Sequence, residues 1–289
     1  MQLQRRLWLF LVPSLLVLTA VLLWPLAYAF WLSLHNYYLG NAVKTWVGLD
    51  NYITLLGEER FWATLYRTVV IVGCAVTLEF VVGLLVAYAL YKLRHGTKTF
   101  SLLLFLPHIV TPVVAALFLR WIFMGRWGLL DGILISLGIF PPDWLGDPHF
   151  ARLTVVLADA WQFTPFMILV LYAGLNTVDK SQIESAQMDG AGNWRLLTEV
   201  MLPAIRPLIF FVLAVRTMDA FRFFDSIYVM TAGGPGTATE TITLYTYALA
   251  FRVLEVGKAS ALGVLTLLIV AGLVALMIAV LYRKERGAF

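Results

Sequence analysis

The sequence is poor in charge and nearly devoid of cysteine. Charged residues make up only 13% of the 289 residues, whereas hydrophobic residues make up 61%. Soluble domains are about 25% charged and about 45–50% apolar, so this composition excludes a soluble globular protein. The single cysteine, Cys74, lies in an apolar run, which excludes internal disulfides and cysteine-based metal sites. The net charge of +4 is small, and we expect no nucleic-acid partner.

Several motifs of catalysis are also missing from the sequence. It contains no G-x-x-x-x-G-K-[ST] for nucleotide phosphates, no H-E-x-x-H zinc motif and no G-x-S-x-G nucleophile elbow. The chain is therefore predicted to be no enzyme and to hold no cofactor or metal of its own. An intramembrane enzyme that uses carboxylate pairs for acid–base chemistry is the alternative from that class.

Long apolar runs are what the sequence has in abundance. A bilayer span takes about 20 apolar residues, and a run that crosses lipid must be helical to satisfy its backbone. We therefore expect an all-α polytopic membrane protein with six transmembrane helices in one domain, residues 1–289. The expected spans cover residues 7–34, 68–91, 100–124, 153–175, 207–231 and 259–282.

The distribution of Lys and Arg predicts the orientation. These residues are more frequent at one set of span ends, most clearly in the short loop Lys92–Lys98, and such ends are cytoplasmic. Both termini are then expected in the cytoplasm. Residues 1–29 also imitate a signal peptide, with Ala27 and Ala29 at a possible cleavage site. We favour an uncleaved first span, because the apolar run is long for a signal and continues to Leu34.

A polar segment, residues 177–206, separates the fourth and fifth runs. Asp179 or Ser181 can cap a first helix over about 180–188, and Gly190 marks a turn at positive φ. A second helix follows and carries an apolar stripe of Trp194, Leu197 and Met201. The sequence predicts a helix-turn-helix, and the pattern alone also fits an amphipathic element on the inner leaflet or a simple loop.

The fifth run contains four charged residues of alternating sign, each three residues from the next: Arg216, Asp219, Arg222 and Asp225. In one continuous helix this spacing brings neighbours within reach as a ladder of ion pairs. Ionisable groups inside a bilayer normally face a cavity or a partner. For the two arginines, ion pairs that lock this helix to a neighbour are an equally good explanation.

Carboxylates and aromatic rings favour a polar pathway for a hydroxyl-rich solute, because carboxylates accept sugar hydroxyls and rings stack on sugars. The expected path residues are Asp159, Trp161, Asp219, Phe223, Asp225 and Tyr228. Isolated polar residues of the other runs are expected to be hydrogen-bond partners between helices, namely Glu79, Arg120 and Gln162.

Within the polar segment, the stretch ESAQMDGAGNWRLLTEVMLP (residues 184–203) resembles the cytoplasmic EAA loop of binding-protein-dependent ABC importer permeases. In that family Glu-Ala-Ala is followed by Asp-Gly-Ala and later by Leu-Pro. Here a serine takes the second motif position, and the other departures keep an apolar residue. The family's loop is a coupling helix that docks into a cleft on a separate ATPase subunit. The resemblance assigns this role to Glu184, Ser185, Ala186, Asp189, Gly190, Ala191, Leu202 and Pro203.

The stretch FDSIYVMTAGGPGTATETITLYTYALAF (residues 224–251) is similar to the first, MalF-like permease subunit of sugar importers of carbohydrate uptake family 1. Trp24-Pro25-Leu26 and Leu106-Pro107 also fit that family, and RTMDAFRFFD (residues 216–225) is similar to trehalose- and maltose-type systems. The resemblance implies a type I ABC importer permease fold and a disaccharide or oligosaccharide substrate.

The same resemblance implies the assembly. The expected partners are a second permease subunit in a heterodimer, two ATP-binding subunits that carry ATP and Mg, and an extracytoplasmic solute-binding protein. The expected location is the bacterial or archaeal cell (inner) membrane, in contact with lipid.

An ion-coupled secondary transporter is the alternative reading of function. Glu79, Asp159 and the carboxylates of the fifth run would then form a proton relay. Such transporters usually show internal repeats, whereas this sequence shows none, and the polar segment would have no explanation.

Overall fold

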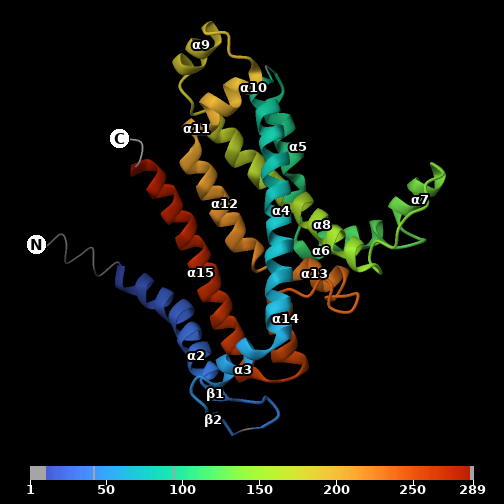
Figure 1. Ribbon diagram of the computed structural model, residues 1–289, viewed down its shortest axis with the longest axis vertical. Helices are drawn as coiled ribbons and strands as arrows, with labels where there is room; N and C mark the ends of the chain where they lie inside the picture. The colour runs from blue at the N-terminus through green and yellow to red at the C-terminus, as the bar shows by residue number, and fades with distance from the viewer. Residues whose placement is uncertain (1–10, 42, 94, 287–289) are drawn as a thin grey trace, which may run out of the picture. The chain divides into compact units, whose positions relative to one another are not determined.

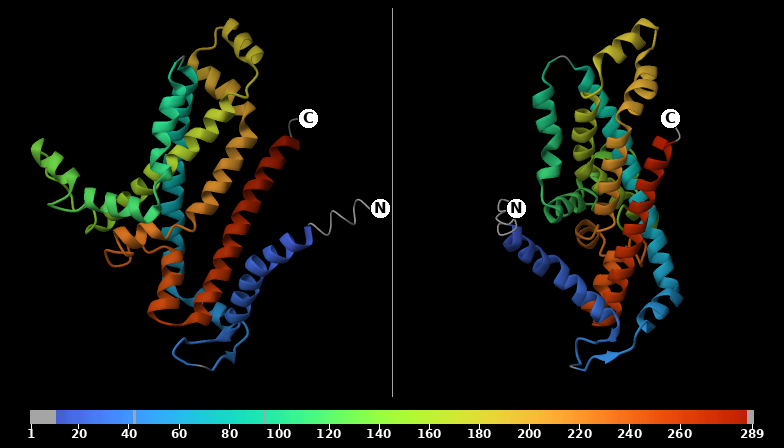
Figure 2. Two further views of the ribbon diagram at one scale, coloured as in Figure 1. Left: turned by 180° about the vertical axis from the view of Figure 1, so that it is seen from behind. Right: turned by 90° about the vertical axis from the view of Figure 1, so that its left-hand side faces the viewer.

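The structure of the chain is a computed structural model that describes residues 11–41, 43–93 and 95–286. Figures 1 and 2 show that helices make up most of the described chain. The chain divides into two compact units, Met1–Ala63 with Tyr245–Ile269 and Thr64–Leu244 with Val270–Phe289. The prediction that the chain forms one domain stays a prediction.

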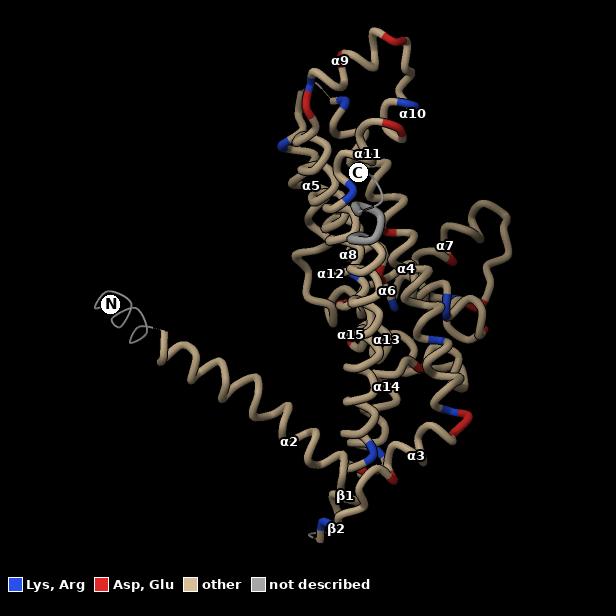
Figure 3. The backbone as a smooth tube through the Cα atoms, turned by 60° about the vertical axis from the view of Figure 1, so that its left-hand side comes forward, with Lys and Arg blue, Asp and Glu red and all other residues tan. Residues whose placement is uncertain are grey.

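The first unit contains the first span, Leu11–Ser33. It includes a π-helical turn, η1 (Thr19–Leu23), and ends as α2 (Trp24–Ser33). Figure 3 shows this span free of Lys, Arg, Asp and Glu, as lipid requires. The expected span began at residue 7, and residues 7–10 lie outside the described residues.

After the first span the chain forms a small cap. Two short antiparallel strands, β1 (His35–Asn36) and β2 (Thr45–Trp46), pair in the register His35 to Trp46. The helix α3 (Asp50–Gly57) follows, and Asn51 Nδ2 donates hydrogen bonds to the carbonyl oxygens of Ser33 and His35 at 2.8 and 3.0 Å. The amide of Asn51 therefore fastens α3 to the end of the first span.

The C-terminal part of the first unit is held to this cap through Glu58. The Glu58 carboxylate pairs with Lys258 and accepts a hydrogen bond from the Tyr245 hydroxyl at 2.7 Å. Burial raises the pKa of Glu58, but the hydrogen bonds from Lys258 and Tyr245, together with the positive charges of Lys258 and Arg60, hold the pKa below its usual value. Gly257 is needed where the chain passes β1, because an added Cβ would lie 2.1 Å from the carbonyl oxygen of His35.

The second unit contains most of the remaining helices. In chain order they are α4 (Glu59–Lys92, from residue 64), α5 (Thr97–Ile109), α6 (Pro112–Ile122), α7 (Leu129–Ser136), α8 (Pro148–Leu175), α9 (Lys180–Met188), α10 (Asn193–Arg195), η2 (Leu196–Met201), α11 (Leu202–Ala204), α12 (Arg206–Ala220) and α13 (Asp225–Met230). The helix α14 (Ile242–Tyr247), the π turn η3 (Ala248–Arg252) and α15 (Val256–Arg286) complete the chain across the two units.

The helix α8 is the centre of the second unit. It packs against α5, α6, α12 and α13. Within its most apolar stretch of 18 residues, 56% of the residues are buried. Its start is defined locally, because the Asp147 side chain accepts hydrogen bonds from the amides of His149 and Phe150 while Pro148 opens the first turn. A buried cluster of Ala116, Leu119, Ala158 and Met230 joins α6, α8 and α13.

The third expected span is sharply bent. The helices α5 and α6 meet at 92°, with Val110 and Thr111 extended between them. A residue before proline is pushed out of the helical region, so Pro112 accounts for the break. The carbonyl oxygen of Val110, which the break frees, accepts a hydrogen bond from Gln162 Nε2 on α8 at 2.9 Å. Gln162 is thus the interhelical partner that its position in an apolar run predicted.

The described residues contain four helices that are long and apolar enough to cross a membrane, or up to six if each bent pair is one span. The four are Leu11–Ser33, Glu59–Lys92, Pro148–Leu175 and Val256–Val280. The bent pairs are α5 with α6, and the stretch Asn193–Ala204 with α12, which meet at 76°. The fifth expected span, residues 207–231, is wrong as one helix, because α12 ends at Ala220.

Candidate functional site

A buried ion cluster lies where α4, α8 and α12 meet. Arg216 on α12 is 2% exposed and makes two parallel hydrogen bonds to Glu79 on α4, at 2.7 and 2.9 Å. The same Nη2 that bonds Glu79 also donates to Asp159 on α8, and the remaining nitrogen, Nη1, donates to Asp219 at 3.2 Å. The guanidinium also stands 4.0 Å from the centre of the Phe163 ring. Arg216 therefore locks three helices together, which is the ion-pair explanation that the sequence left open.

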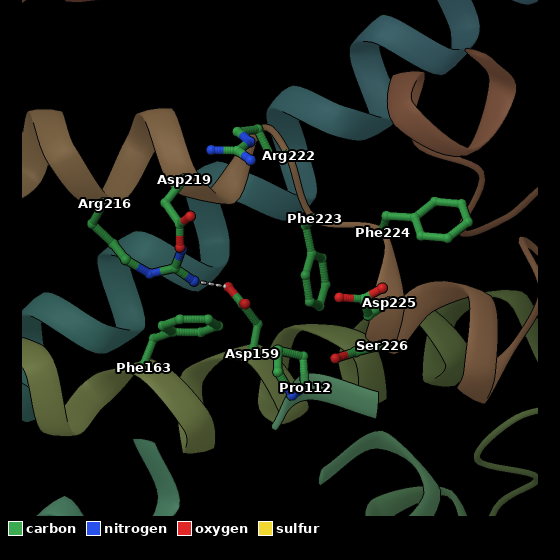
Figure 4. Close-up of a pocket in the computed structure, with 10 residues that line it drawn as sticks. All are labelled: Pro112, Asp159, Phe163, Arg216, Asp219, Arg222, Phe223, Phe224, Asp225 and Ser226. Carbon is green, nitrogen blue, oxygen red and sulfur yellow. Dashed lines mark hydrogen bonds and ion pairs between the residues drawn. The ribbon is translucent and has the colours of Figure 1, made fainter. Parts of the chain in front are cut away.

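A pocket of about 180 Å³ opens beside this cluster (Figure 4). Its walls come from α8, from the end of α12, from the turn after α12 and from the first residues of α6 and α13. The lining residues are Pro112, Asp159, Phe163, Arg216, Asp219, Arg222, Phe223, Phe224, Asp225 and Ser226. Acidic, basic and aromatic groups thus share one small cavity, on whose open side Asp219, Arg222 and Asp225 are exposed.

Four of the six expected path residues line this pocket: Asp159, Asp219, Phe223 and Asp225. Two do not. Trp161 lies on α8 outside the pocket and is 39% exposed, and Tyr228 stacks on Phe224 with ring centres 5.2 Å apart. Tyr228 therefore adjoins the pocket through Phe224, whereas Trp161 is not part of it.

The expected ladder of four charges in one helix is wrong. Its first rung exists, because Arg216 pairs with Asp219, but the helix ends before Arg222 and a new helix starts at Asp225. The carbonyl oxygens freed by this break accept hydrogen bonds from hydroxyls further along the chain. Thr243 donates to Phe221 at 2.9 Å, and Thr241 donates to Phe223 at 3.4 Å. Arg222 is exposed and makes no ion pair within the described residues.

The polar segment begins as the sequence predicts. The helix α9 covers Lys180–Met188, and the Asp179 side chain caps it by accepting the Ser181 amide at 2.9 Å. That hydrogen bond holds the pKa of Asp179 below its usual value. Gly190 has a φ of +81°, as the predicted turn requires, and no other atom lies within 4 Å of an added Cβ.

The second half of the polar segment differs from its expected form. Residues 193–204 form one short helical stretch whose middle, η2, is a π-helix. Leu197 and Met201 are buried, whereas Trp194 is 69% exposed, so the three residues of the expected apolar stripe do not share one environment. The wider π turn shifts the angular spacing from the 3.6-residue period on which the stripe was based.

The eight residues assigned to coupling all lie on the surface of the polar segment or close beneath it. Ala186, Ala191 and Leu202 are half-buried, whereas the exposed ones are Glu184, Ser185, Asp189, Gly190 and Pro203. Met188 is 89% exposed and Trp194 points outward on the same segment. Figure 3 shows that Lys, Arg, Asp and Glu recur along α9 and α10.

The polar segment is tied to α4. The Tyr88 hydroxyl donates to the backbone carbonyl of Asn193 at 2.9 Å, and Lys92 Nζ donates to the Asn193 side chain at 2.9 Å. Lys92 also lies 5.4 Å from the centre of the Tyr88 ring. The helix that supplies Glu79 to the buried cluster therefore also holds the polar segment.

A family described as "Binding-protein-dependent transport system inner membrane component" matches residues 80–286. The chain belongs to this family.

Known proteins of similar sequence support the same conclusion. The trehalose/maltose transport system permease protein MalF of Thermococcus litoralis is 35% identical over 263 residues, which are 91% of this chain and 89% of that protein. The trehalose transport system permease protein SugA of Mycobacterium tuberculosis is 37% identical over 287 residues, 99% of this chain and 90% of that protein.

The fold is that of ABC importer permeases. A bacterial alginate ABC transporter, solved in complex with an alginate pentasaccharide-bound periplasmic protein, superimposes with a TM-score of 0.81. The alignment covers 96% of this chain and 93% of the other, at 22% identity.

Several residues of the permease site were not anticipated from the sequence. Phe163, Pro112 and Ser226 line the pocket but carry no sequence signal, because nothing local distinguishes them from other residues of apolar runs. Glu79 could have been assigned to the cluster, since a carboxyl group in an apolar run needs a partner and few arginines lie within spans. Among the described residues, no group of three or more His, Cys, Asp and Glu is arranged to hold a metal.

Proposed function

We propose that this permease is a membrane-spanning subunit of an ATP-driven carbohydrate importer and forms half of its translocation path. The observation that carries the proposal is the pocket in which three aspartates and three phenylalanines meet. Sites for small molecules commonly measure about 300–1,000 Å³. The pocket of about 180 Å³ suits a path completed by a second, similar permease. A disaccharide or oligosaccharide of the trehalose or maltose type is the proposed substrate.

The chemistry of the pocket suits a sugar. The carboxylates of Asp159, Asp219 and Asp225 can accept sugar hydroxyl groups, and the ring of Phe223 can stack on a pyranose face. Glu79 and Asp159 are both engaged by Arg216, so neither is free to carry protons across the membrane. This arrangement favours the importer over the ion-coupled transporter.

The polar segment is proposed to dock onto one ATP-binding subunit, and the partner permease would dock onto a second one. Its exposed Met188 and Trp194 offer the kind of apolar and aromatic surface that protein interfaces bury. Both termini and this segment would lie in the cytoplasm, and an extracytoplasmic solute-binding protein would deliver the sugar to the other face. ATP and Mg would be held by the ATP-binding subunits alone.

Energy coupling then requires two states of the path. ATP-driven closure of the ATPase subunits would move the polar segment and switch the pocket between outward- and inward-open states. The switch is driven by the different affinities of ATP and of the sugar-loaded binding protein for those two states.

Phe223→Ala is the test of the pocket. It should lower uptake of radiolabelled trehalose about tenfold or more, because a large apolar contact is worth roughly 1.5–3 kcal/mol. Trp161→Ala is the matched control, since it removes a large ring from α8 outside the pocket. Membrane abundance of each variant is measured by immunoblot. Wild-type uptake in Phe223→Ala at normal abundance, or a larger loss in Trp161→Ala, would contradict the assignment of the path.

Tyr88→Phe is the test of the tie between α4 and the polar segment. It removes one hydrogen bond to Asn193, typically worth about 0.5–1.5 kcal/mol, so stimulation of ATP hydrolysis by the loaded binding protein should fall about two- to tenfold. Tyr91→Phe is the control, because Tyr91 stacks on Tyr88 but makes no hydrogen bond in the described structure. Equal stimulation of ATP hydrolysis in Tyr88→Phe and Tyr91→Phe would show that the hydrogen bond from Tyr88 to Asn193 takes no part in coupling.

A further inference from the structure

We infer that the pocket selects solutes by charge, accepting uncharged sugars and excluding anionic ones. The inference rests on the proposed function, because it specifies which carbohydrates the path admits. It follows from the balance of charges around the pocket and from the hydrogen-bonding groups that the walls leave available.

The charged groups around the pocket have an excess of acid. Three carboxylates line it, Asp159, Asp219 and Asp225, and Glu79 lies directly behind Arg216. Against these four acids stand two bases, Arg216 and Arg222. A single proton shared between Glu79 and Asp159 would still leave one negative charge in excess. The pocket is therefore negative in both of these protonation states.

Arg216 offers little attraction to an anion, although it lines the pocket. Its guanidinium is buried and already bonded to Glu79, Asp159 and Asp219. An anionic solute would have to displace one of these carboxylates and leave it buried without a partner, which is costly. Arg222 is the remaining base, and Asp225 lies three residues away in the same wall.

The buried wall of the pocket has one acceptor that is not used. Asp159 is 1% exposed, and its Oδ1 atom has no hydrogen-bond partner within the described residues. A buried carboxylate oxygen of this kind needs a donor. A sugar hydroxyl supplies one, whereas a carboxylate or a phosphate dianion supplies only further acceptors. Figure 4 shows Asp159 at the wall of the pocket, beside Pro112 and opposite Phe223.

The exclusion of anions is a property of these residues and not of the fold. An alginate transporter of the same fold is involved in the import of an acidic polysaccharide. The selectivity of this permease must therefore lie in the side chains that line its own pocket, with Asp219 and Asp225 as the two exposed carboxylates that a solute would meet.

The experiment compares trehalose with trehalose 6-phosphate as probes. The complex of this permease with its partner subunits is purified in nanodiscs without the binding protein, and solute contact is measured by saturation-transfer NMR. Wild-type complex should contact trehalose, while trehalose 6-phosphate should bind at least about tenfold more weakly because of charge repulsion at short range. The preference should shrink as salt rises from about 0.01 M to about 1 M, where the Debye length falls from about 30 to about 3 Å.

Two variants locate the filter. Asp219→Asn and Asp225→Asn should each raise the ratio of phosphorylated to neutral sugar bound, and the double variant should raise it most. Glu199→Gln removes the same charge from the exposed polar segment and should leave the ratio unchanged. Equal binding of both sugars to the wild type at every salt concentration would overturn the charge filter and leave the sugar path standing. Contact with neither sugar would overturn the filter together with the proposed path.

Discussion

Arg216→Met is expected to deprive the permease of most of its stability. The substitution leaves Glu79 and Asp159 buried side by side without the cation that holds them, and both are almost fully inaccessible. Removing one partner of a buried ion pair typically costs about 3–5 kcal/mol. The measurement is the fraction of protein that stays monodisperse on size-exclusion chromatography after heating in detergent. We expect a midpoint far below that of the wild type and much less protein in the membrane.

A rescue variant separates this cause from general damage to α12. Combining Arg216→Met with Glu79→Gln and Asp159→Asn removes all three charges, and a neutral cluster often matches or exceeds a buried ion cluster in stability. The combined variant should therefore recover most of the midpoint while losing transport. Arg222→Met is the control, since Arg222 is exposed and makes no ion pair in the described chain, so it should change stability by less than about 0.5 kcal/mol. If Arg216→Met alone were as stable as the wild type, Arg216 would not be what locks α4, α8 and α12 together.

Gly190→Val is expected to disconnect ATP hydrolysis from transport. The φ of Gly190 is +81°, a conformation that costs a β-branched residue roughly 1–3 kcal/mol. Space is not the obstacle, because no other atom lies within 4 Å of an added Cβ. The strain is therefore purely one of backbone conformation, and relieving it would change the angle between α9 and the helical stretch 193–204.

Gly192→Val is the matched control for this prediction. Gly192 lies two residues away in equally open space, but its φ of −72° suits any residue. In the reconstituted complex, ATPase activity is measured with and without sugar-loaded binding protein. Gly190→Val should lose the stimulation or the bound ATPase, and Gly192→Val should keep both. Full stimulation and transport in Gly190→Val would falsify the coupling role of the turn.

Glu184→Lys probes the same segment through charge. Glu184 is exposed on α9, so its replacement should not disturb the fold, but a repelling charge would face any basic group on the ATPase. The expected result is weaker association that high salt partly restores, measured as the amount of ATPase that co-purifies with the permease.

The parts of the structure that local signals determine were predictable from the sequence. The helix α9 has the expected bounds because Asp179 caps it and Gly190 ends it, and both signals act within a few residues. The grouping of Asp159 with Asp219, Phe223 and Asp225 was also anticipated, from the rarity of polar groups in apolar runs and from the likeness to sugar permeases.

The parts that depend on distant residues were not predictable in this way. The stretch FRFF after α12 contains neither glycine nor proline, and its break is stabilised by the hydroxyls of Thr241 and Thr243, about twenty residues away. Trp194 is exposed next to the π turn η2, and the residues of η2 have no local preference that would predict such a turn. Both differences arise where tertiary contacts select a backbone that local preference does not favour.

The two attachments of α4 have a mechanical consequence. Glu79 bonds to α12, and Tyr88 and Lys92 bond to the stretch that leads into α12. These attachment points lie about 20 Å apart along the helix, which corresponds to the thirteen residues from Glu79 to Lys92. The 76° bend between the stretch 193–204 and α12 lies between these two attachments, so α4 is bonded to both sides of the bend. A push on the polar segment should therefore reach α12 through α4 as well as through the bend, and a change of the bend angle beside Pro207 would strain one of the two attachments.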